Sequence, residues 1–476
     1  MIVAFLSHIR ALALFIIFFA ASLLPQPTYI EGVVGQPTGF TPQSATNDID
    51  RSINKIIYRS LFTYDSEGSI QNDLADYWER SDDGLVYTVR LGSDQHWQDG
   101  KLITANDVLY TVGSYQKLSG IATDRLDNRT VRFTLPNKFS PFLDLLTVPL
   151  LPEHKGDSNN PWLPVGSGTY RVVRITRDQG LVRSVVLEGN SLSLGIARVV
   201  FRFYESEDDL EMAAKLGEIN GFYEKNGSFT YKGFTKYSKA ESNRYYALFY
   251  NLRRDYLKEL NVRAQLTSAL PVSKMLKEAL GDNFVLASGP LSLNKYSVGD
   301  LSYAGVSGKT VLPKELTLVV VDTDQNGTLA AFIKEAWGKL GVNVYVKAYE
   351  AEKVTNDVLP SRDFDVLLYG QEVSFDPDRY VLWHTTQDAF PGLNLSGLSN
   401  ARSDKALEEG RKVNSFEDRY KHYAMFQSAV MAQIPAVFLY HPVFNYYLRS
   451  NLINIDLKNF SLPEDRFYSL SSWAFN

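Results

Sequence analysis

Residues 316–346 read LTLVVVDTDQNGTLAAFIKEAWGKLGVNVYV, and this stretch decides the fold class. Leu316–Val321 is a short, apolar, β-branched run, which is typical of a buried strand. After a loop at residues 322–327, apolar side chains recur at helical spacing from Leu329 to Leu340, and Gly341 follows at the position that often ends a helix. Val342–Val346 then alternates apolar and polar residues. This strand–helix–strand order predicts a parallel crossover and therefore an α/β fold.

The loop at residues 322–327, DTDQNG, also fits the opening of a calcium-binding loop. The twelfth position of such a loop carries a bidentate glutamate, and here that position is Ile333. The flanking pattern is strand–loop–helix, whereas a calcium loop of this kind lies between two helices. We therefore favour a turn whose polar side chains cap the helix, and we expect no metal and no cofactor in this protein.

Further strands and a long helix are expected around this unit. Phe364–Leu368 and Tyr245–Asn251 are apolar or aromatic runs that are typical of strands. Ser415 begins a long helical pattern that Pro435 ends, and Ala436–Tyr440 follows as another strand. The α/β organisation predicted from residues 316–346 therefore extends over the C-terminal half of the chain.

The N-terminal half carries strong turn and cap signals. Ser81–Gly84 reads SDDG, a turn, and precedes the strand pattern Leu85–Leu91. Thr104–Asp107 resembles a capping box at the start of a helix that runs from Val108. Residues 152–168 are rich in Pro, Gly, Asn and Asp, so we place a boundary between lobes there.

Length and composition narrow the class of protein. A chain of 476 residues is too long for one core, and 45% hydrophobic with 22% charged residues is close to the globular average. The net charge of −5 offers no basic excess for phosphates, so nucleic-acid binding is not expected. The absence of cysteine excludes disulfides, zinc–thiolate sites, iron–sulfur clusters and thiol nucleophiles.

The first residues predict export. Arg10 is the only Lys, Arg, Asp or Glu before Glu31, and the apolar run Ala11–Leu24 has the length of a signal-peptide core and is short for a membrane span. We predict that residues 1–28 form either a cleaved signal peptide or an N-terminal membrane anchor. The mature chain then lies outside the cytoplasm, in the periplasm or at the outer face of the cytoplasmic membrane.

Motifs for hydrolysis are weak. The six histidines form no HExxH pattern, and no GxSxG elbow is present. Ser307–Thr310 reads SGKT like the end of a phosphate-binding loop, but Tyr303 stands where the first glycine belongs. A secreted hydrolase stays an alternative, because the members of a triad or a carboxylate pair need not be neighbours in sequence.

Five blocks, in order, resemble extracellular solute-binding proteins of family 5, the oligopeptide/dipeptide-binding class of peptide and nickel ABC transporters. The most specific block runs from Ser81 through Asp99-Gly100 to Val108 and is similar to the pattern SDDGLxYTFxLRxxVxFxDGxPxTAxDV. The others are Ile57–Asp65 (IYRSLFTYD) with Asp73–Glu79 (DLADYWE); Val165–Tyr170 (VGSGTY); Tyr246–Leu252 with Asn261–Leu266 (NVRAQL); and Phe375–Asp378 (FDPD), Trp383, Leu393–Gly397 (LNLSG) and Ile434–Tyr440 (IPAVFLY). They span nearly the whole predicted mature chain.

The resemblance implies a periplasmic-binding-protein-like fold of the large three-part class. Two α/β lobes are joined by a hinge and close on a ligand. Lobe I is discontinuous, at residues 29–48, 165–252 and 438–476. An inserted subdomain covers residues 49–164, and lobe II covers residues 253–437.

The resemblance also implies a function: a non-enzymatic, monomeric binding protein that captures oligopeptides and delivers them to an ABC permease in the membrane. Other solutes (nickel, haem or a sugar) and a sensory module stay open as alternatives. Two features depart from the family. The lipobox cysteine of many relatives is missing, and Val373 stands where peptide binders often place the aspartate that anchors the α-amine of the ligand; Glu372 lies beside it.

Candidate ligand-binding residues follow from the expected strand end. Residues 369–376 leave the predicted strand Phe364–Leu368 at its carboxyl end, where open α/β sheets bind ligands. Glu372 and Asp376 are candidates for binding cationic groups, and the alternative is solvated loop acids or a cap. Trp383 is a candidate for stacking on the ligand, with the lobe core as the alternative. Asn394 is a candidate for binding the ligand backbone, with a turn cap as the alternative. The full predicted set is Gly35, Gln36, Pro37, Tyr369, Gln371, Glu372, Asp376, Trp383 and Asn394, with no catalytic and no metal-binding residue. Tyr246 and Tyr440 are expected to pack in the core or hinge.

Overall fold

The computed structural model describes residues 26–45, 47–191, 193–299, 301–303, 305 and 310–476. Residues 1–25, which make up most of the predicted export segment at residues 1–28, lie outside this part of the chain. The export role of the segment therefore stays a prediction. Within the described residues, no helix combines the length and the apolar composition that a membrane crossing requires.

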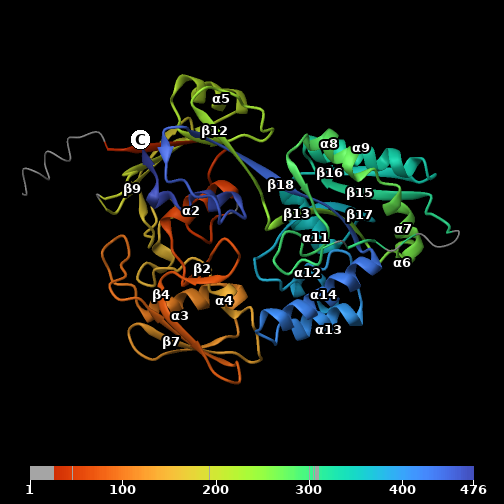
Figure 1. The fold of residues 1–476 in the computed structure, drawn as a ribbon, viewed down its shortest axis with the longest axis horizontal. Helices are drawn as coiled ribbons and strands as arrows, with labels where there is room; N and C mark the ends of the chain where they lie inside the picture. Colours follow the sequence, from red (N-terminus) through yellow and green to blue (C-terminus); the bar gives the residue numbers. More distant parts are fainter. Residues whose placement is uncertain (1–25, 46, 192, 300, 304, 306–309) are drawn as a thin grey trace, which may run out of the picture.

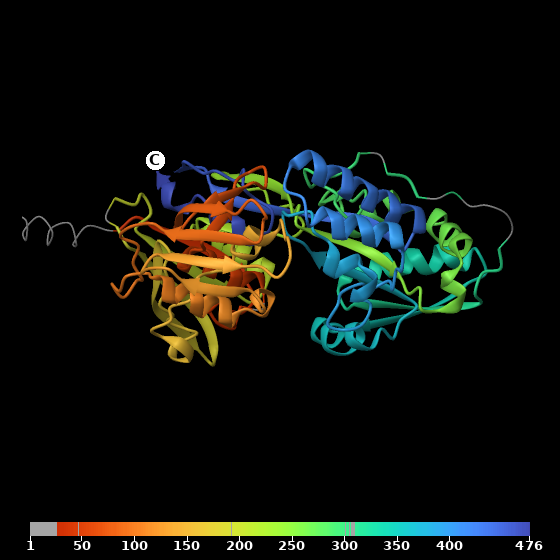
Figure 2. The same cartoon turned by 90° about the horizontal axis from the view of Figure 1, so that it is seen from below.

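Two bodies are joined by a narrow set of strands (Figures 1 and 2). One 12-stranded sheet runs through both in the order β16-β15-β17-β13-β18-β11-β1-β10-β9-β8, with β12 and β14 also paired to β18. Strand β18 (Ala436–Arg449) crosses between the bodies, because its first half pairs with β13 and its second half with β11 and β12. The predicted strand Ala436–Tyr440 is therefore only the first half of this connection.

The first lobe is the body built around β1, and its core is rich in rings. β1 pairs in parallel with β10 and β11, whereas β9 and β8 continue antiparallel. Tyr29, Phe201 and Trp473 are fully buried in its core together with one face of α2. Its elements are β1 (Thr28–Val34), α2 (Asp48–Ile57), β8 (Tyr170–Asp178), β9 (Leu181–Gly189), β10 (Arg198–Tyr204), α5 (Glu207–Leu216), β11 (Gly221–Tyr223), β12 (Phe234–Ala240), β19 (Leu452–Ile453) and β20 (Ala474–Phe475).

A small subdomain with its own core lies below the first lobe in Figure 1. Its four-stranded sheet has the order β4-β5-β7-β6. The predicted capping box is present: the side chain of Asp107 accepts from the Thr104 backbone N–H at 2.8 Å. The elements are β2 (Phe62–Tyr64), β3 (Ile70–Asn72), β4 (Ala75–Arg80), β5 (Val86–Leu91), α3 (Ala105–Ser114), β6 (Ala122–Arg125), β7 (Thr130–Thr134) and α4 (Phe142–Leu145).

The second lobe is the body built on β13, β15, β16 and β17, and it confirms the predicted crossover. β15 and β16 pair in parallel, with α9 between them. The elements are β13 (Arg244–Tyr250), α6 (Asp255–Lys258), α7 (Leu260–Ser268), α8 (Val272–Leu280), β14 (Phe284–Leu286), β15 (Glu315–Val321), α9 (Asp324–Gly338), β16 (Asn343–Tyr349), α10 (Ala351–Lys353), α11 (Leu359–Ser361), β17 (Val366–Glu372), α12 (Tyr380–Trp383), α13 (Ala401–Gly410) and α14 (Phe416–Gln433).

Side-chain alternation along β15 explains how the second lobe holds two cores. Leu318 and Val320 pack with α7, α8 and α9 on one face of the sheet, whereas Val319 packs with α13 and α14 on the other. The sequence of a strand that is covered on both faces is a continuous apolar run. This pattern is why β15 could be predicted clearly from the sequence.

Two boundaries in this lobe differ from the predictions. Helix α9 begins at Asp324, inside the predicted loop, because the Thr323 hydroxyl accepts the N–H of Asn326 and caps the helix. The predicted capping role of this loop is thereby confirmed. Strand β17 continues to Glu372 rather than ending at Leu368, because β13 pairs with it over its whole length.

Candidate ligand-binding cleft

A cleft of about 880 Å³ lies between the two lobes. The first lobe contributes the end of β1 and one face of α2, and the second contributes β17, the start of β13 and the first turn of α9. Lining residues include Val34, Asp48, Arg51, Arg244, Tyr369 and Glu372. A volume of this size, with walls from two bodies, is typical of a small-molecule or short-peptide site.

Tyr369 and Glu372 are the predicted site residues that line this cleft. Gly35, Gln36 and Pro37 follow directly after Val34 and lie outside the lining. Gln36 is instead held by β9, donating to the Val182 carbonyl at 3.2 Å and accepting the Val182 N–H at 2.8 Å. The structure thus places the first predicted loop beside the cleft rather than in its wall.

Four other predicted residues lie inside the second lobe. Gln371 is buried and accepts from the Tyr245 hydroxyl at 2.5 Å, since side chains alternate along β17 and Gln371 lies on the face opposite to Glu372. Asp376 pairs with Arg419 through two contacts of 2.8 Å. Trp383 is 1% exposed, in the core. Asn394 closes a turn by accepting the Leu398 N–H at 3.1 Å.

Trp383 follows the core interpretation and Asn394 the turn-cap interpretation, whereas Gln371 is buried and Asp376, 10% exposed, is neutralised by Arg419 rather than solvated. The physical reason is the extra length of β17, which moves the end of the strand from residue 368 to residue 372. The segment after the strand then turns back into its own lobe, where Arg419 neutralises Asp376. We therefore do not carry Gln371, Asp376, Trp383 or Asn394 into the proposed site.

No clear sequence pattern indicates the aromatic floor of the cleft. Tyr246 and Tyr440 stack with ring centroids 4.8 Å apart and planes 3° apart, and both line the cleft. Burial raises the pKa of both hydroxyls. Both residues were expected to pack in the core or the hinge. Tyr246 lies on β13, and Tyr440 lies on β18, the strand that crosses between the two bodies. Gly370 makes room for the ring of Tyr246, because a Cβ there would lie 2.9 Å from it.

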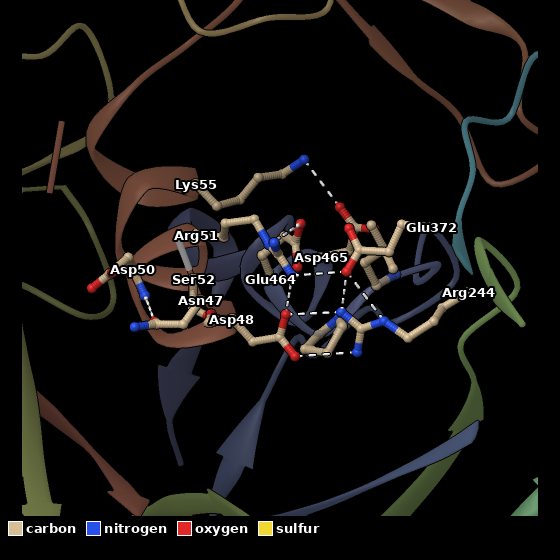
Figure 3. A network of polar contacts seen from close by, with 12 residues as sticks. Asn47, Asp48, Asp50, Arg51, Ser52, Lys55, Arg244, Glu372, Glu464 and Asp465 are labelled. Atoms are coloured by element: carbon tan, nitrogen blue, oxygen red, sulfur yellow. Dashed lines mark hydrogen bonds and ion pairs between the residues drawn. The ribbon is translucent and has the colours of Figure 1, made fainter. Parts of the chain in front are cut away.

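A network of charged side chains crosses the cleft (Figure 3). From α2, Arg51 donates to Glu372 Oε1 at 3.0 Å, and Asp48 accepts from Arg244 through contacts of 2.9 and 3.2 Å. Arg244 also contacts Glu372 directly. The α2 residues Asp48 and Arg51 are far apart in the sequence from Arg244 and from Glu372, which is why no local motif indicated the network. They tie the first lobe to the second.

Two further carboxyls extend the network and are poorly neutralised. Glu241 lies 2.8 Å from Arg244, and Glu464 lies 3.6 Å from Arg51. Burial raises the pKa of Glu241 to about 7, against the lowering effect of Arg244. Burial, with Asp465 as the second cause, raises the pKa of Glu464 to about 7. Both carboxyls therefore titrate near neutral pH.

The bodies also touch on the side of the small subdomain. Lys295 donates to Ser69 at 3.1 Å, the Ser140 N–H donates to the Arg411 carbonyl at 2.7 Å, and the rings of Tyr64 and Phe375 lie 4.8 Å apart. Contacts at this interface and across the charged network bridge the two bodies, and the cleft between them stays partly open to solvent. We call this state, with the bodies in contact at two places, the closed arrangement.

The described residues contain no group of three or more histidine, aspartate or glutamate side chains placed to hold a metal ion. The groups that the cleft offers to a ligand include the ion network, the tyrosine pair and the backbone of the surrounding strand ends. Such an arrangement is suited to holding a solute between the two lobes.

The model for bacterial extracellular solute-binding proteins, family 5 Middle, matches residues 69–390. This chain belongs to that family. Its members are solute-binding proteins rather than enzymes, and the resemblance found in the sequence is confirmed. The family also accounts for the fold, with its two α/β lobes, hinge and inserted subdomain.

Individual relatives are distant but match along most of the chain. The oligopeptide-binding protein AppA of Bacillus subtilis (strain 168) is 23% identical over 93% of this chain and 91% of its own. The probable D,D-dipeptide-binding periplasmic protein DdpA of Escherichia coli (strain K12) is 24% identical over 91% of each. The solved structure of a putative peptide-binding protein AppA from Clostridium difficile superimposes with a TM-score of 0.81 at 20% identity, covering 94% of this chain and 100% of that one.

Proposed function

We propose that this protein is the extracytoplasmic substrate-binding component of an ABC importer, and that it captures oligopeptides in the cleft between its lobes and delivers them to the permease. The observation that carries the proposal is the cleft itself, of about 880 Å³, whose walls come from both lobes of a family 5 solute-binding protein. The names of the relatives, oligopeptide- and dipeptide-binding proteins, support peptides as the solute.

An unpaired strand edge supports a peptide ligand independently of those names. β13 pairs with β17 over residues 366–372, but on the other edge β15 reaches only Val366–Leu368. Within the described strands, residues 369–372 therefore have a free edge, and Tyr369, Gly370 and Glu372 line the cleft. A peptide backbone binds such an edge by adding as a further strand, largely independently of its side chains.

Ligand binding would act on the relation between the lobes. A ligand that contacts both walls stabilises the closed arrangement by its differential affinity for that state. The permease would then distinguish the closed, loaded protein from the open one. The protein binds its ligand without turnover in this proposal, acts as a monomer, and is exported by residues 1–28.

The division into lobes at residues 29–48, 165–252 and 438–476, with a subdomain at 49–164 and a second lobe at 253–437, stays a prediction. We propose one change to it. Helix α2 packs in the core of the first lobe through Ile53, Ile56 and Ile57. The inserted subdomain is better placed after this helix than from residue 49.

Native mass spectrometry of residues 29–476, before and after mild denaturation, tests the proposal. We expect a mixture of released short peptides that tandem sequencing identifies, and a rise in melting temperature when a peptide pool is added. An empty protein without a thermal shift would contradict a peptide ligand. The same assay with sugars, haem and nickel complexes then tests the other solutes, since one similar solved structure is a complex with Ni(L-His).

A further inference from the structure

The chain contains three asparagine–glycine pairs: Asn220-Gly221, Asn226-Gly227 and Asn326-Gly327. In such a pair the glycine amide nitrogen can attack the side-chain amide carbon of the asparagine, because glycine has no Cβ to hinder the approach. The attack requires an asparagine side chain that is free to turn and a glycine N–H that no acceptor holds. The structure distinguishes the three pairs by these two requirements.

Asn326 and Gly327 are both held in the first turn of α9. Asn326 is 5% exposed, and its side chain donates to the Val321 carbonyl at 2.9 Å. The Gly327 N–H donates to the Thr323 carbonyl at 2.9 Å. Neither group can react unless the start of the helix opens.

Asn220 and Gly221 are held by the sheet of the first lobe. The Asn220 side chain accepts the Ile30 N–H at 2.8 Å. Gly221 lies in β11, which pairs with β1 on one side and with β18 on the other. Attack by the Gly221 nitrogen would require β11 to leave the sheet.

Asn226 and Gly227 lie in the loop between β11 and β12, and they meet both requirements. Asn226 is exposed, and its side chain makes no hydrogen bond to the described residues. The buried carboxylate of Glu224 organises the loop by accepting the backbone N–H groups of residues 226, 228 and 229. The N–H of Gly227 is left out of this set and has no acceptor within the described part of the chain.

A hydrogen bond to the same peptide group favours the reaction further. The Asn226 carbonyl, which shares its peptide group with the Gly227 N–H, accepts from Asn283 Nδ2 at 2.7 Å. Asn283 is itself oriented by Asn445, whose Nδ2 donates to the Asn283 Oδ1 at 2.8 Å. When the Gly227 nitrogen loses its proton, negative charge spreads onto the Asn226 oxygen, and a hydrogen bond to that oxygen stabilises the charged form.

We propose that Asn226 is a site of spontaneous deamidation in the folded protein. Base from the solvent removes the Gly227 amide proton, and the nitrogen bonds to the side-chain amide carbon of Asn226. The bond from that carbon to Nδ2 breaks, the nitrogen takes a proton from water and leaves as ammonia, and a cyclic succinimide remains. Water then opens the ring at either carbonyl and leaves aspartate or isoaspartate. The net change consumes water and releases ammonia.

The modification changes the wall of the cleft, because Asn226 and Asn283 both line it. Either product carries a new negative charge at residue 226. Isoaspartate also routes the main chain through the former side chain, which adds a methylene group between residues 226 and 227. This longer link disturbs the spacing of the N–H groups that Glu224 accepts. The proposal does not depend on which solute the cleft binds.

The other two pairs serve as internal controls, so the test needs no variant. We would incubate the folded protein in heavy-oxygen water at neutral and mildly alkaline pH, digest it with trypsin in ordinary water, and measure the incorporated label by mass spectrometry. The three pairs fall on separate fragments, residues 216–225, 226–232 and 315–334. Label at Asn226 should appear about tenfold or more faster than at Asn220 or Asn326, because these two react only after local opening.

Two further readings test the route. The rate at Asn226 should rise with pH, because the reaction needs the deprotonated Gly227 nitrogen, and isoaspartate should form beside aspartate, because the ring opens at either carbonyl. Aspartate alone would overturn the succinimide route.

The same incubation in denaturant tests the role of the fold. The three pairs should then react at similar rates, because the contacts that hold Asn220 and Asn326 are gone. A difference that persists in denaturant would assign the selectivity to the local sequence and overturn the role of the fold. Equal rates at the three pairs in the folded protein would overturn the proposal itself.

Discussion

Asp144 is buried where the small subdomain meets the second lobe, and this environment predicts that the stability of the protein depends on pH. It lies on α4 of the small subdomain and faces the Asp376–Asp378 segment of the second lobe. Burial first, and then Asp376, raise its pKa from the ordinary value of 3.8 to about 8. Asp376 and Asp378 have partners of their own, Arg419 and Arg411, but one oxygen of Asp144 is buried without a hydrogen-bond partner among the described residues.

A raised carboxyl pKa in the folded protein means that the folded state holds the proton longer than the unfolded chain. Stability is therefore lost as pH rises from about 4 to about 8. We expect Asp144→Asn to remove a loss of roughly 3 kcal/mol between pH 5 and pH 8. Thermal unfolding at several pH values measures this. An unchanged pH profile in the variant would show that Asp144 is hydrated rather than buried.

Arg244 should be the most sensitive residue of the charged network. Its removal leaves Asp48, Glu241 and Glu372 close together with only Arg51 to balance them, and Glu241 is buried. We expect Arg244→Ala to destabilise the protein by about 3 kcal/mol, as breaking a buried ion pair does. Arg90→Ala is the control, because Arg90 and Asp76 form an exposed pair whose loss should change the stability little. Urea unfolding compares the two, and similar losses would contradict the assigned burial.

At the scale of elements, close approach limits what the first-lobe sheet tolerates. Gly221 on β11 lies against Tyr29 of β1, and a Cβ there would come within 1.9 Å of the Tyr29 hydroxyl and 2.6 Å of Leu448. Tyr29 itself is held by a hydrogen bond to Tyr446 at 2.6 Å and by Glu31. The ring therefore has no free direction in which to move.

We expect Gly221→Ala to destabilise the protein by about 2 kcal/mol through overpacking. Gly113→Ala on α3 is the matched change at an open position, with no atom within 4 Å of the new Cβ. It should be neutral or stabilising by up to about 1 kcal/mol, because alanine favours a helix. Chemical denaturation of both variants checks the pair, and a tolerated Gly221→Ala would mean that β11 shifts freely.

Elements that depend on local pattern were predictable, and those that depend on distant partners were not. The β15–α9–β16 crossover follows from apolar periodicity, and the Ser415 cap of α14 from one side chain. The predicted end of β17 was wrong because the length of this strand is fixed by its pairing with β13, more than a hundred residues earlier in the chain. The charged network is harder still, since Asp48 and Arg244 are separated by 196 residues. Of the predicted site, only Tyr369 and Glu372 line the cleft.

At the scale of the whole molecule, the closed arrangement is held by two separate sets of contacts. The charged network joins α2 to the second lobe, and Lys295, Phe375 and Arg411 join the second lobe to the small subdomain. Within the network, the pair that joins α2 to β17, Arg51 and Glu372, has side chains that are 29% and 42% exposed, and ion pairs as accessible as this one contribute little in water. The two bodies are otherwise linked by few strands, so the contacts alone should leave an open form populated until a ligand bridges the walls.

The absence of cysteine allows this motion to be measured directly. Exposed Asp82, at the turn before β5, and exposed Lys405, on α13, lie on the two bodies and are replaced by cysteines for a donor and an acceptor dye. We expect energy transfer to rise when peptide is added, and to rise less in Glu372→Gln. The pair Lys347→Cys and Lys405→Cys lies within the second lobe and should not respond. If the first pair is also unchanged at saturating peptide, the ligand binds a cleft that is already closed, and the permease must recognise something other than closure.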